Sequence, residues 1–202
     1  MDRIEVTAKN LANHGFQVQV FDNAAQAKEA ALSIIGKQSV GFGGSMTVHE
    51  MGLYETLQEQ GNGVYWHWRA KDKSQFPEIF KKAHEAEVYL SSSNAILESG
   101  ALLNIDGTGN RLENLFSGPK TVIVIAGENK LCADYEDALK RIKRDACPPN
   151  ARRLNLKTPC AAKECTDCNT PDRMCNVTLL LERPSNLVKN VHVFLVKKSL
   201  GF

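Results

Sequence analysis

Four of the six cysteines in this chain of 202 residues lie within a stretch of sixteen, which predicts a metal site. Cys160, Cys165, Cys168 and Cys175 follow a C-x4-C-x2-C-x6-C pattern. Disulfides are typical of exported proteins, and the first residues carry no export signal, so we expect thiolates that bind a metal. Structural zinc prefers two C-x2-C pairs, whereas a 4Fe-4S cluster tolerates irregular spacing. We therefore expect a 4Fe-4S cluster, with zinc as the alternative, and the pattern leaves open whether Cys147 joins the site.

The segment around these cysteines, residues 147–176, has neither helical nor strand periodicity. About 30 residues without regular structure are unusual in a compact domain, and a bound metal would supply the missing order. The segment is also basic, because residues 141–202 hold 12 Lys and Arg against 5 Asp and Glu, whereas residues 1–140 hold 13 against 18. A centre with four thiolates carries about −2 of charge. Nearby cations would offset it: Arg152, Arg153, Lys157, Lys163 and Arg173.

Two glycine-rich turns at expected helix starts predict a site for a small anion. Gly41-Phe42-Gly43-Gly44-Ser45 follows a strand, and Gly107-Thr108-Gly109-Asn110-Arg111 opens a second helix. Backbone N–H groups at such points attract phosphate or carboxylate, and the Arg111 guanidinium can grip an anion with two hydrogen bonds. Tight packing of a helix on the sheet is the alternative for the first turn. The predicted ligand-binding residues are Gly43, Gly44, Ser45, Met46, Thr47, Ser93, Asn94, Gly107, Thr108, Gly109, Asn110 and Arg111.

One carboxylate is placed where it could do chemistry. Glu98 lies in the expected turn Leu97-Glu98-Ser99-Gly100, directly after the polar strand end Ser91–Asn94. A carboxylate held at a sharp turn can act as a nucleophile or a general base, and the alternative is a solvated hairpin residue. Glu98 is therefore the candidate catalytic residue.

Helices alternate with short buried strands along the chain, and this alternation predicts an α/β fold. These elements must position the residues named above. The expected strands cover 16–21, 39–42, 64–68, 88–91, 121–126, 177–182 and 191–196, with a hairpin over 95–105. The expected helices cover 24–35, 47–60 and 77–86, a short stretch from 110, and a stretch from 134 that Pro148-Pro149 ends. The fully apolar run 121–126 predicts a central strand. We expect one domain over residues 1–202, with a central parallel or mixed sheet, helices on both faces and a cysteine-rich loop.

Composition excludes several classes of protein. With 43 % hydrophobic and 24 % charged residues, the chain is neither disordered nor of low complexity. Its apolar runs are far shorter than the ~18 residues of a membrane span, so we expect a cytoplasmic protein with no membrane partner. No zinc-finger, RNP or helix-turn-helix spacing is present, and we expect no nucleic acid partner.

Four motifs in order resemble the LUD domain (lactate utilisation domain) proteins over nearly the whole chain. They are Gly43-Gly44-Ser45-Met46-Thr47 with Glu50 and Gly52-Leu53, Ser93-Asn94-Ala95-Ile96 with Glu98-Ser99-Gly100, Asn104-Ile105-Asp106-Gly107-Thr108-Gly109-Asn110-Arg111, and Gly118-Pro119-Lys120. The stretches around Cys160, Cys168 and Cys175 resemble the short members that carry cysteines. The resemblance implies the α/β fold shared by ribose-phosphate isomerase, glucosamine-phosphate deaminase and CoA-transferase.

The resemblance also implies a relation to the lactate-utilisation C subunit, which belongs to an iron-sulfur system that oxidises lactate to pyruvate. We expect the chain to bind a small anionic metabolite beside its metal and to take part in oxidation of lactate or another 2-hydroxy acid. The expected partners are an iron-sulfur or dehydrogenase subunit and further copies of this chain. Two alternatives stay open. One is a CoA-transferase-like or phosphosugar-type enzyme that uses Glu98, since a Glu-x-Gly turn holds the nucleophile of the CoA-transferase relatives; the other is a non-catalytic subunit with a structural zinc.

Overall fold

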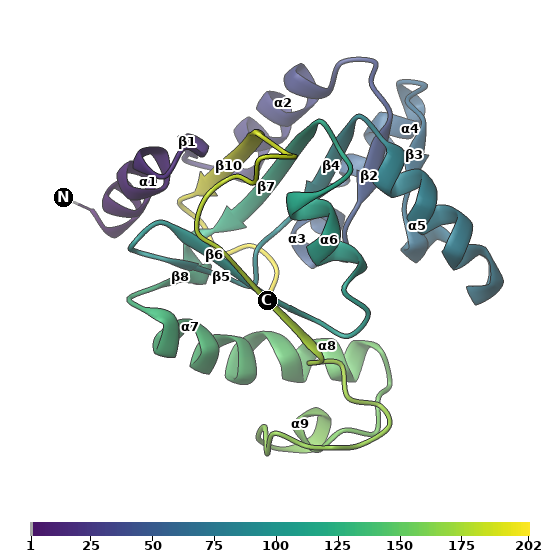
Figure 1. Ribbon diagram of the computed structural model, residues 1–202, viewed down its shortest axis with the longest axis vertical. Coiled ribbons are helices and arrows are strands. Elements are labelled where there is room, and N and C mark those ends of the chain that lie inside the picture. Colours follow the sequence, from purple (N-terminus) through teal and green to yellow (C-terminus); the bar gives the residue numbers. More distant parts are fainter. Residues whose placement is uncertain (1) are drawn as a thin grey trace.

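Two β-sheets form the inner layers of the molecule (Figure 1). The computed structural model describes residues 2–202. Over these residues the large sheet has six strands, and every neighbouring pair is parallel. Its strands in order are β1 (Gln17–Phe21), β10 (Asn190–Val196), β7 (Thr121–Gly127), β4 (Val88–Ser91), β2 (Val40–Phe42) and β3 (Val64–Tyr65). The predicted α/β class and the central place of the apolar strand β7 are therefore confirmed.

The small sheet has four strands and is mixed, because β5 pairs antiparallel with β6 and parallel with β8, and β6 pairs antiparallel with β9. Its order is β8 (Leu131–Cys132), β5 (Ala95–Leu97), β6 (Ala101–Asp106) and β9 (Val177–Leu181). The expected hairpin is present as β5 and β6. Hydrophobic periodicity predicted β5, β6 and β9 but not β8, and it did not show that these strands leave the large sheet, since periodicity carries no information on which strands pair.

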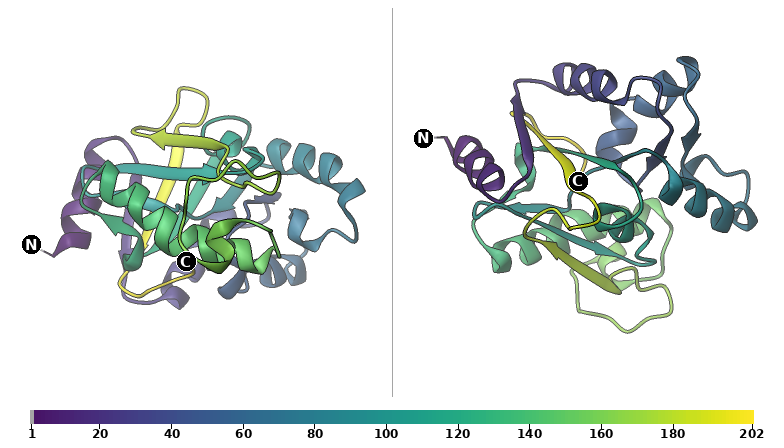
Figure 2. Two further views of the ribbon diagram at one scale, coloured as in Figure 1. Left: turned by 90° about the horizontal axis from the view of Figure 1, so that it is seen from below. Right: turned by 45° about the horizontal axis from the view of Figure 1, so that its top comes forward.

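Helices cover the outer faces of both sheets. The segments α2 (Ala24–Ile35), α3 (Met46–Glu50) and α4 (Leu53–Glu59) pack on one face of the large sheet. The other face meets α1 (Arg3–Asn13), α5 (Phe76–Glu85), α6 (Asn110–Phe116) and the small sheet. The run through α7 (Tyr135–Arg141) and α8 (Cys147–Arg153) lies along the far side of the small sheet, followed by α9 (Pro159–Ala162) (Figures 1 and 2). Within residues 2–202, no helix has the length and apolar character that a bilayer crossing requires.

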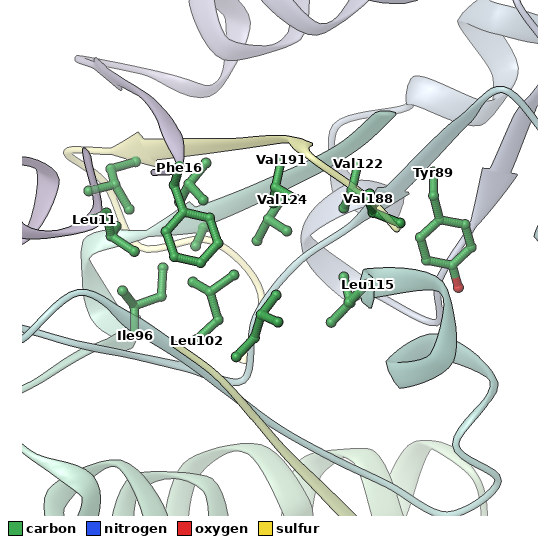
Figure 3. Close-up of a cluster of buried hydrophobic side chains, with 14 of the residues drawn as sticks. Leu11, Phe16, Tyr89, Ile96, Leu102, Leu115, Val122, Val124, Val188 and Val191 are labelled. Atoms are coloured by element: carbon green, nitrogen blue, oxygen red, sulfur yellow. The ribbon is translucent and has the colours of Figure 1, made fainter. Parts of the chain in front are cut away.

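The main core lies between the two sheets, where side chains of β7 and β10 face those of the hairpin (Figure 3). Strand side chains alternate between faces, so Val122 and Val124 of β7 point to this core while Ile123 and Ile125 point to the helices on the opposite face. Ile96 of the hairpin packs opposite them (Figure 3). Burial on both faces explains why residues 121–126 are apolar without interruption.

Two expected helices have different boundaries. The helix expected from Thr47 is divided at Gly52, which adopts φ of 61°, and its first cap is Ser45, whose hydroxyl accepts a hydrogen bond from the Val48 N–H. The prediction that Pro148-Pro149 ends a helix is wrong. A π-helical turn (Ile142–Ala146) joins α7 to α8, and the prolines occupy the first turn of α8, where an N–H would have no helical partner.

Three further differences concern short or unpredicted elements. The strand expected over 64–68 stops at Tyr65 and continues as a 3-10 turn (His67–Arg69). The segment 147–176 contains the helices α8 and α9 despite its lack of periodicity. No expected helix precedes residue 24, although Ile4, Thr7 and Leu11 form the buried face of α1 at helical spacing.

A pair of glycines tests how closely α1 packs on the hairpin. Both Gly100 and Gly61 have positive φ, 92° and 83°, but a Cβ on Gly100 would lie 2.6 Å from the Asn10 carbonyl carbon, whereas one on Gly61 would meet no atom within 4 Å. We expect Gly61→Ala to lower the free energy of unfolding by about 1–2 kcal/mol through left-handed strain alone. Gly100→Ala adds about 1–3 kcal/mol of overpacking. Urea unfolding measures the free energy of unfolding of both variants. Equal losses in the two variants would contradict the close packing of α1 on Gly100.

Candidate functional site

A cavity of about 250 Å³ opens at the carboxyl ends of the parallel strands β2, β4 and β7, and we call it the ligand cavity. The chain after β2 supplies Gly44 and Ser45, the chain after β4 supplies Ser92 to Asn94, and the chain after β7 supplies Lys130. The wall opposite comes from the end of β6, from α6 and from α8. Loops at the carboxyl ends of parallel strands are where α/β proteins bind ligands.

The structure brings both glycine turns to this cavity. Nine of the twelve predicted ligand-binding residues line it: Gly44, Ser45, Met46, Ser93, Asn94, Gly107, Thr108, Asn110 and Arg111. Gly43, Thr47 and Gly109 lie outside its wall. Each of the three has a structural role: a Cβ on Gly43 would lie 2.7 Å from the Ser91 hydroxyl, Thr47 is buried, and Gly109 begins α6 at φ of 85°.

Arg111 is built into the wall rather than aimed at a ligand. Its side chain is 6 % exposed, and its N–H groups donate to five protein oxygens. The acceptors are Asp106 Oδ1 (2.5 and 3.0 Å), Asn94 Oδ1 (2.7 Å), Asn104 Oδ1 (2.9 Å), Ile105 O (3.2 Å) and Ser92 O (3.3 Å). The expected two-bond grip on an anion is therefore wrong in its geometry, because the guanidinium donors already have partners.

Lys130 brings a buried amine to the ligand cavity, and the two hydrogen-bond partners of this amine are uncharged hydroxyl groups. Its side chain is 3 % exposed, and Nζ donates to Thr47 Oγ1 at 2.8 Å and to Ser92 Oγ at 2.9 Å. Burial and the neighbouring Arg141 and Arg111 guanidinium groups lower the pKa of Lys130 to about 7. Perturbed ionisable groups in a cavity are frequent at functional sites.

The mouth of the cavity combines a cation with aromatic rings. The Arg153 guanidinium lies 4.1 Å from the centre of the Trp68 ring, and its Nε and Nη2 both donate to Asn150 Oδ1. Trp68 in turn stacks on Trp66 with 5.0 Å between ring centres. Burial lowers the pKa of His67 to about 4. The Asp106 carboxylate raises this pKa and the Arg153 guanidinium lowers it further. The imidazole is therefore neutral at pH 7.

Glu98 lies away from the ligand cavity, at the outer turn of the hairpin. Its carboxylate forms an ion pair with Arg3 of α1, and its backbone carbonyl accepts a hydrogen bond from Asn10 Nδ2 at 2.6 Å. The structure therefore does not bring the candidate nucleophile to the residues that line the cavity. Its position instead attaches α1 to the small sheet.

The four predicted metal ligands surround a second, smaller cavity of about 20 Å³, which we call the cysteine pocket. Cys160 comes from α9, and the other three come from the irregular chain before β9. Arg173 orders that chain, because its guanidinium donates to the carbonyls of Cys168 and Cys175 and pairs with Asp167. Lys143 also lines the pocket and lies 3.6 Å from the Asp167 carboxylate.

The cysteine pocket offers four sulfur donors, which in this arrangement are not closed around a single ion. Four thiolates bound to one zinc at about 2.3 Å would lie within roughly 4 Å of one another. Among residues 2–202, no three histidine, cysteine or acidic side chains lie close enough together to hold one metal ion. The thiolates of a 4Fe-4S cluster bind separate irons and enclose a larger volume. Four cysteines, with Lys143 and Arg173 beside them, would supply the sulfur donors of such a cluster, while the pocket of about 20 Å³ would have to widen to enclose it.

A fifth cysteine, Cys147, connects the two cavities. Its sulfur lies 3.4 Å from that of Cys175, and both residues line the ligand cavity. The hydrogen bond from the Cys147 thiol lowers the pKa of Cys175 to about 7, with help from Arg173 and Lys143, while the same bond and burial raise the pKa of Cys147. Cys132, by contrast, is a core residue of the small sheet.

Comparison with known proteins identifies the family. Residues 4–196 match the model of the LUD domain. The chain belongs to the LUD domain family. The resemblance carried by the four motifs is thereby confirmed, and the family's name links it to lactate utilisation. The crystal structure of a DUF162 family protein from Deinococcus radiodurans superposes with a TM-score of 0.56 at 10 % identity, covering 97 % of this chain and 99 % of that one. This LUD domain protein therefore shares the fold of the Deinococcus protein, and no curated protein matches it.

Sequence reasoning missed several cavity residues of this LUD domain protein, among them His67, Trp68, Lys130 and Arg153. Lys130 could have been found, because it follows the central apolar strand by a few residues, at the sheet edge where parallel strands present ligand-binding loops. Arg153 and Trp68 had no such signal. They meet only because α8 continues beyond Pro148-Pro149.

Arg111 is expected to matter for stability as well as binding. Arg111→Ala leaves the Asp106 carboxylate, only 13 % exposed, without its partner, and we expect a loss of about 3–5 kcal/mol in the free energy of unfolding. Arg111→Lys should recover less than half, because an ammonium cannot reproduce the planar fork. Denaturant melts of the three proteins measure the effect. An unchanged melt for Arg111→Ala would show that the network is not structural.

Glu98 is expected to be dispensable for ligand binding. Glu98→Gln removes the ion pair with Arg3, which is 45 % exposed, so the free energy of unfolding should change by less than about 1 kcal/mol. Arg3→Gln is the control from the other side: it removes the same pair together with the exposed pair between Arg3 and Asp137, and it should also change the free energy of unfolding by less than about 1 kcal/mol. A large loss of ligand affinity or turnover in Glu98→Gln alone would restore the nucleophile hypothesis.

Proposed function

We propose that this LUD domain protein binds a small anionic metabolite in the ligand cavity, beside a 4Fe-4S cluster held by Cys160, Cys165, Cys168 and Cys175, and takes part in the oxidation of lactate or another 2-hydroxy acid. One observation carries the proposal: Met174 and Cys175 line both cavities. A metabolite in the ligand cavity would therefore be separated from a cluster in the cysteine pocket by the width of a single residue.

The charges around the ligand cavity support an anionic metabolite. Three cations, Arg111, Lys130 and Arg153, line the cavity against one carboxylate, that of Asp106, which Arg111 already neutralises. The ammonium of Lys130 has no carboxylate within 4 Å among the described residues. An anion would supply the missing counter-charge, and a volume of about 250 Å³ suits a metabolite of a few carbons.

The surroundings of the cysteine pocket support an electron-transfer role. A 4Fe-4S cluster supplies or accepts single electrons when bound, with a potential that depends on burial and on nearby charge. Lys143 and Arg173 line the pocket with Asp167, which pairs with both, so the two cations would offset only part of the negative charge of four thiolates. Such a centre beside a hydroxy acid provides a route for the electrons that oxidation releases.

Metal analysis tests the cluster. After anaerobic purification we expect about four irons and four sulfides per chain, with broad absorption near ~400 nm. Cys165→Ser and Cys168→Ser should lose most of the iron, because each removes a thiolate that the cluster requires. The matched control is Cys132→Ala, a buried cysteine of the small sheet outside the cysteine pocket, which should keep its iron. One zinc per chain and no iron would overturn the electron-transfer proposal in favour of a structural subunit.

The ligand is tested by titrating small carboxylates into the holoprotein. We expect lactate or pyruvate to bind and to change the electron paramagnetic resonance spectrum of the reduced cluster, because Cys175 adjoins both cavities. Arg153→Gln should weaken binding by roughly tenfold, the scale of one charge-assisted contact. Arg152→Gln, a change at the preceding exposed residue outside the cavity wall, is the control. Binding without any spectral change would contradict the adjacency of the two sites.

A further inference from the structure

The amine of Lys130 is held in a fixed position at the inner end of the ligand cavity. Lys130 ends a 3-10 turn (Glu128–Lys130) that directly follows β7, so its backbone is fixed by the central strand of the large sheet. Thr47, in the first turn of α3, and Ser92, directly after β4, accept hydrogen bonds from Nζ. Two of the three ammonium donors are thereby used, which leaves one valence of Nζ free of these bonds, and Lys130 lines the cavity.

The charged groups around Lys130 favour the neutral amine. Arg141 of α7 and Arg111 of α6 are the cations that act on it, and Glu50 of α3 is the carboxylate that opposes them. Arg141 is itself buried, and its guanidinium donates to backbone carbonyls of Asn129 and Asn94. A lysine that is desolvated and placed beside other cations is an activated nucleophile, since part of its population is unprotonated at neutral pH.

We propose that Lys130 is a nucleophilic amine of the ligand cavity and condenses with the keto group of a small 2-oxo acid. The inference rests on the proposed function, which it extends from binding to a covalent step. Arg153 at the mouth is placed to pair with the carboxylate of such an acid, and Ile105 and Ile142 give its short carbon chain an apolar wall. The substrate class is thus a 2-oxo acid, the oxidised counterpart of a 2-hydroxy acid.

The step needs no oxidant or reductant. The lone pair of Lys130 Nζ attacks the keto carbon, a C–N bond forms, and a proton moves from nitrogen to the former keto oxygen to give a carbinolamine. Loss of that oxygen as water, together with the second N–H proton, leaves a C=N imine. The hydroxyl of Ser92, which lines the cavity, lies 2.9 Å from Nζ, where it can pass these protons between nitrogen and oxygen, while Thr47 holds Nζ from behind the cavity wall.

Reductive trapping tests the proposal. The holoprotein is incubated anaerobically with pyruvate and sodium cyanoborohydride, which converts an imine to a stable secondary amine, and the modified lysine is located by peptide mass spectrometry. We expect one adduct per chain at Lys130. Its yield should rise as the pH is raised from about 6 to about 8, because the amine loses its proton in this range.

Matched variants distinguish this site from reactive surface lysines. Lys130→Arg keeps a cation but cannot form an imine, so we expect at least a tenfold loss of adduct. Lys120→Arg, a change at an exposed lysine just before β7, should retain the wild-type yield. A thermal melt checks that Lys130→Arg folds. If this variant does not fold, the position of the adduct in the wild-type protein still tests the proposal.

The outcomes separate the two proposals. Adducts spread over surface lysines, or an undiminished yield in a folded Lys130→Arg, would overturn the nucleophilic role. Pyruvate binding by calorimetry without any adduct would also overturn it while leaving the proposed anion site intact. Absence of binding as well as of adduct would overturn both the nucleophile and the proposed metabolite.

Discussion

The buried guanidinium of Arg111 is the constraint on which the ligand cavity depends. One side chain from α6 satisfies the carboxylate of Asp106, the side-chain oxygens of Asn94 and Asn104, and two backbone carbonyls. Those partners belong to the chain after β4 and to the end of β6, so the large sheet and the small sheet are joined at this point. Ordinary apolar packing could not hold so many polar groups without penalty, because each would be buried without a partner.

The cysteine segment completes a cavity that the sheets alone leave open. Arg153 and Cys147 from α8, and Met174 and Cys175 from the chain before β9, line the cavity together with the glycine turns. Hydrogen bonds of Arg173 and Asn176, and packing of Met174 against the small sheet, order the chain before β9. Binding of a metal and binding of a metabolite would consequently favour the same conformation, and each would strengthen the other through shared ordering of the chain.

Local sequence patterns were sufficient for most of the fold and for part of the site. An uninterrupted apolar run predicted β7, hydrophobic periodicity predicted the hairpin and most of the helices, and the glycine turns pointed to the correct edge of the sheet. Which strands pair with one another was not predictable, because the division into two sheets depends on contacts between residues distant in sequence, such as Leu103 with Leu180. The role of Arg111 was misjudged for the same reason: its sequence neighbourhood shows a free cation, and only the fold reveals the acceptors around it.

The order of strands also has a consequence for synthesis of the protein. Strand β1, made among the first residues, lies at the edge of the large sheet, and its neighbour in the described chain is β10, residues 190–196. A ribosome must therefore complete almost all of these residues before β1 can pair. Until then the growing polypeptide carries β7 without its β10 neighbour, an unfinished apolar edge of the kind that chaperones bind and that aggregates when left exposed. Efficient production of this fold is thus a matter of protecting the nascent chain until its last strand arrives.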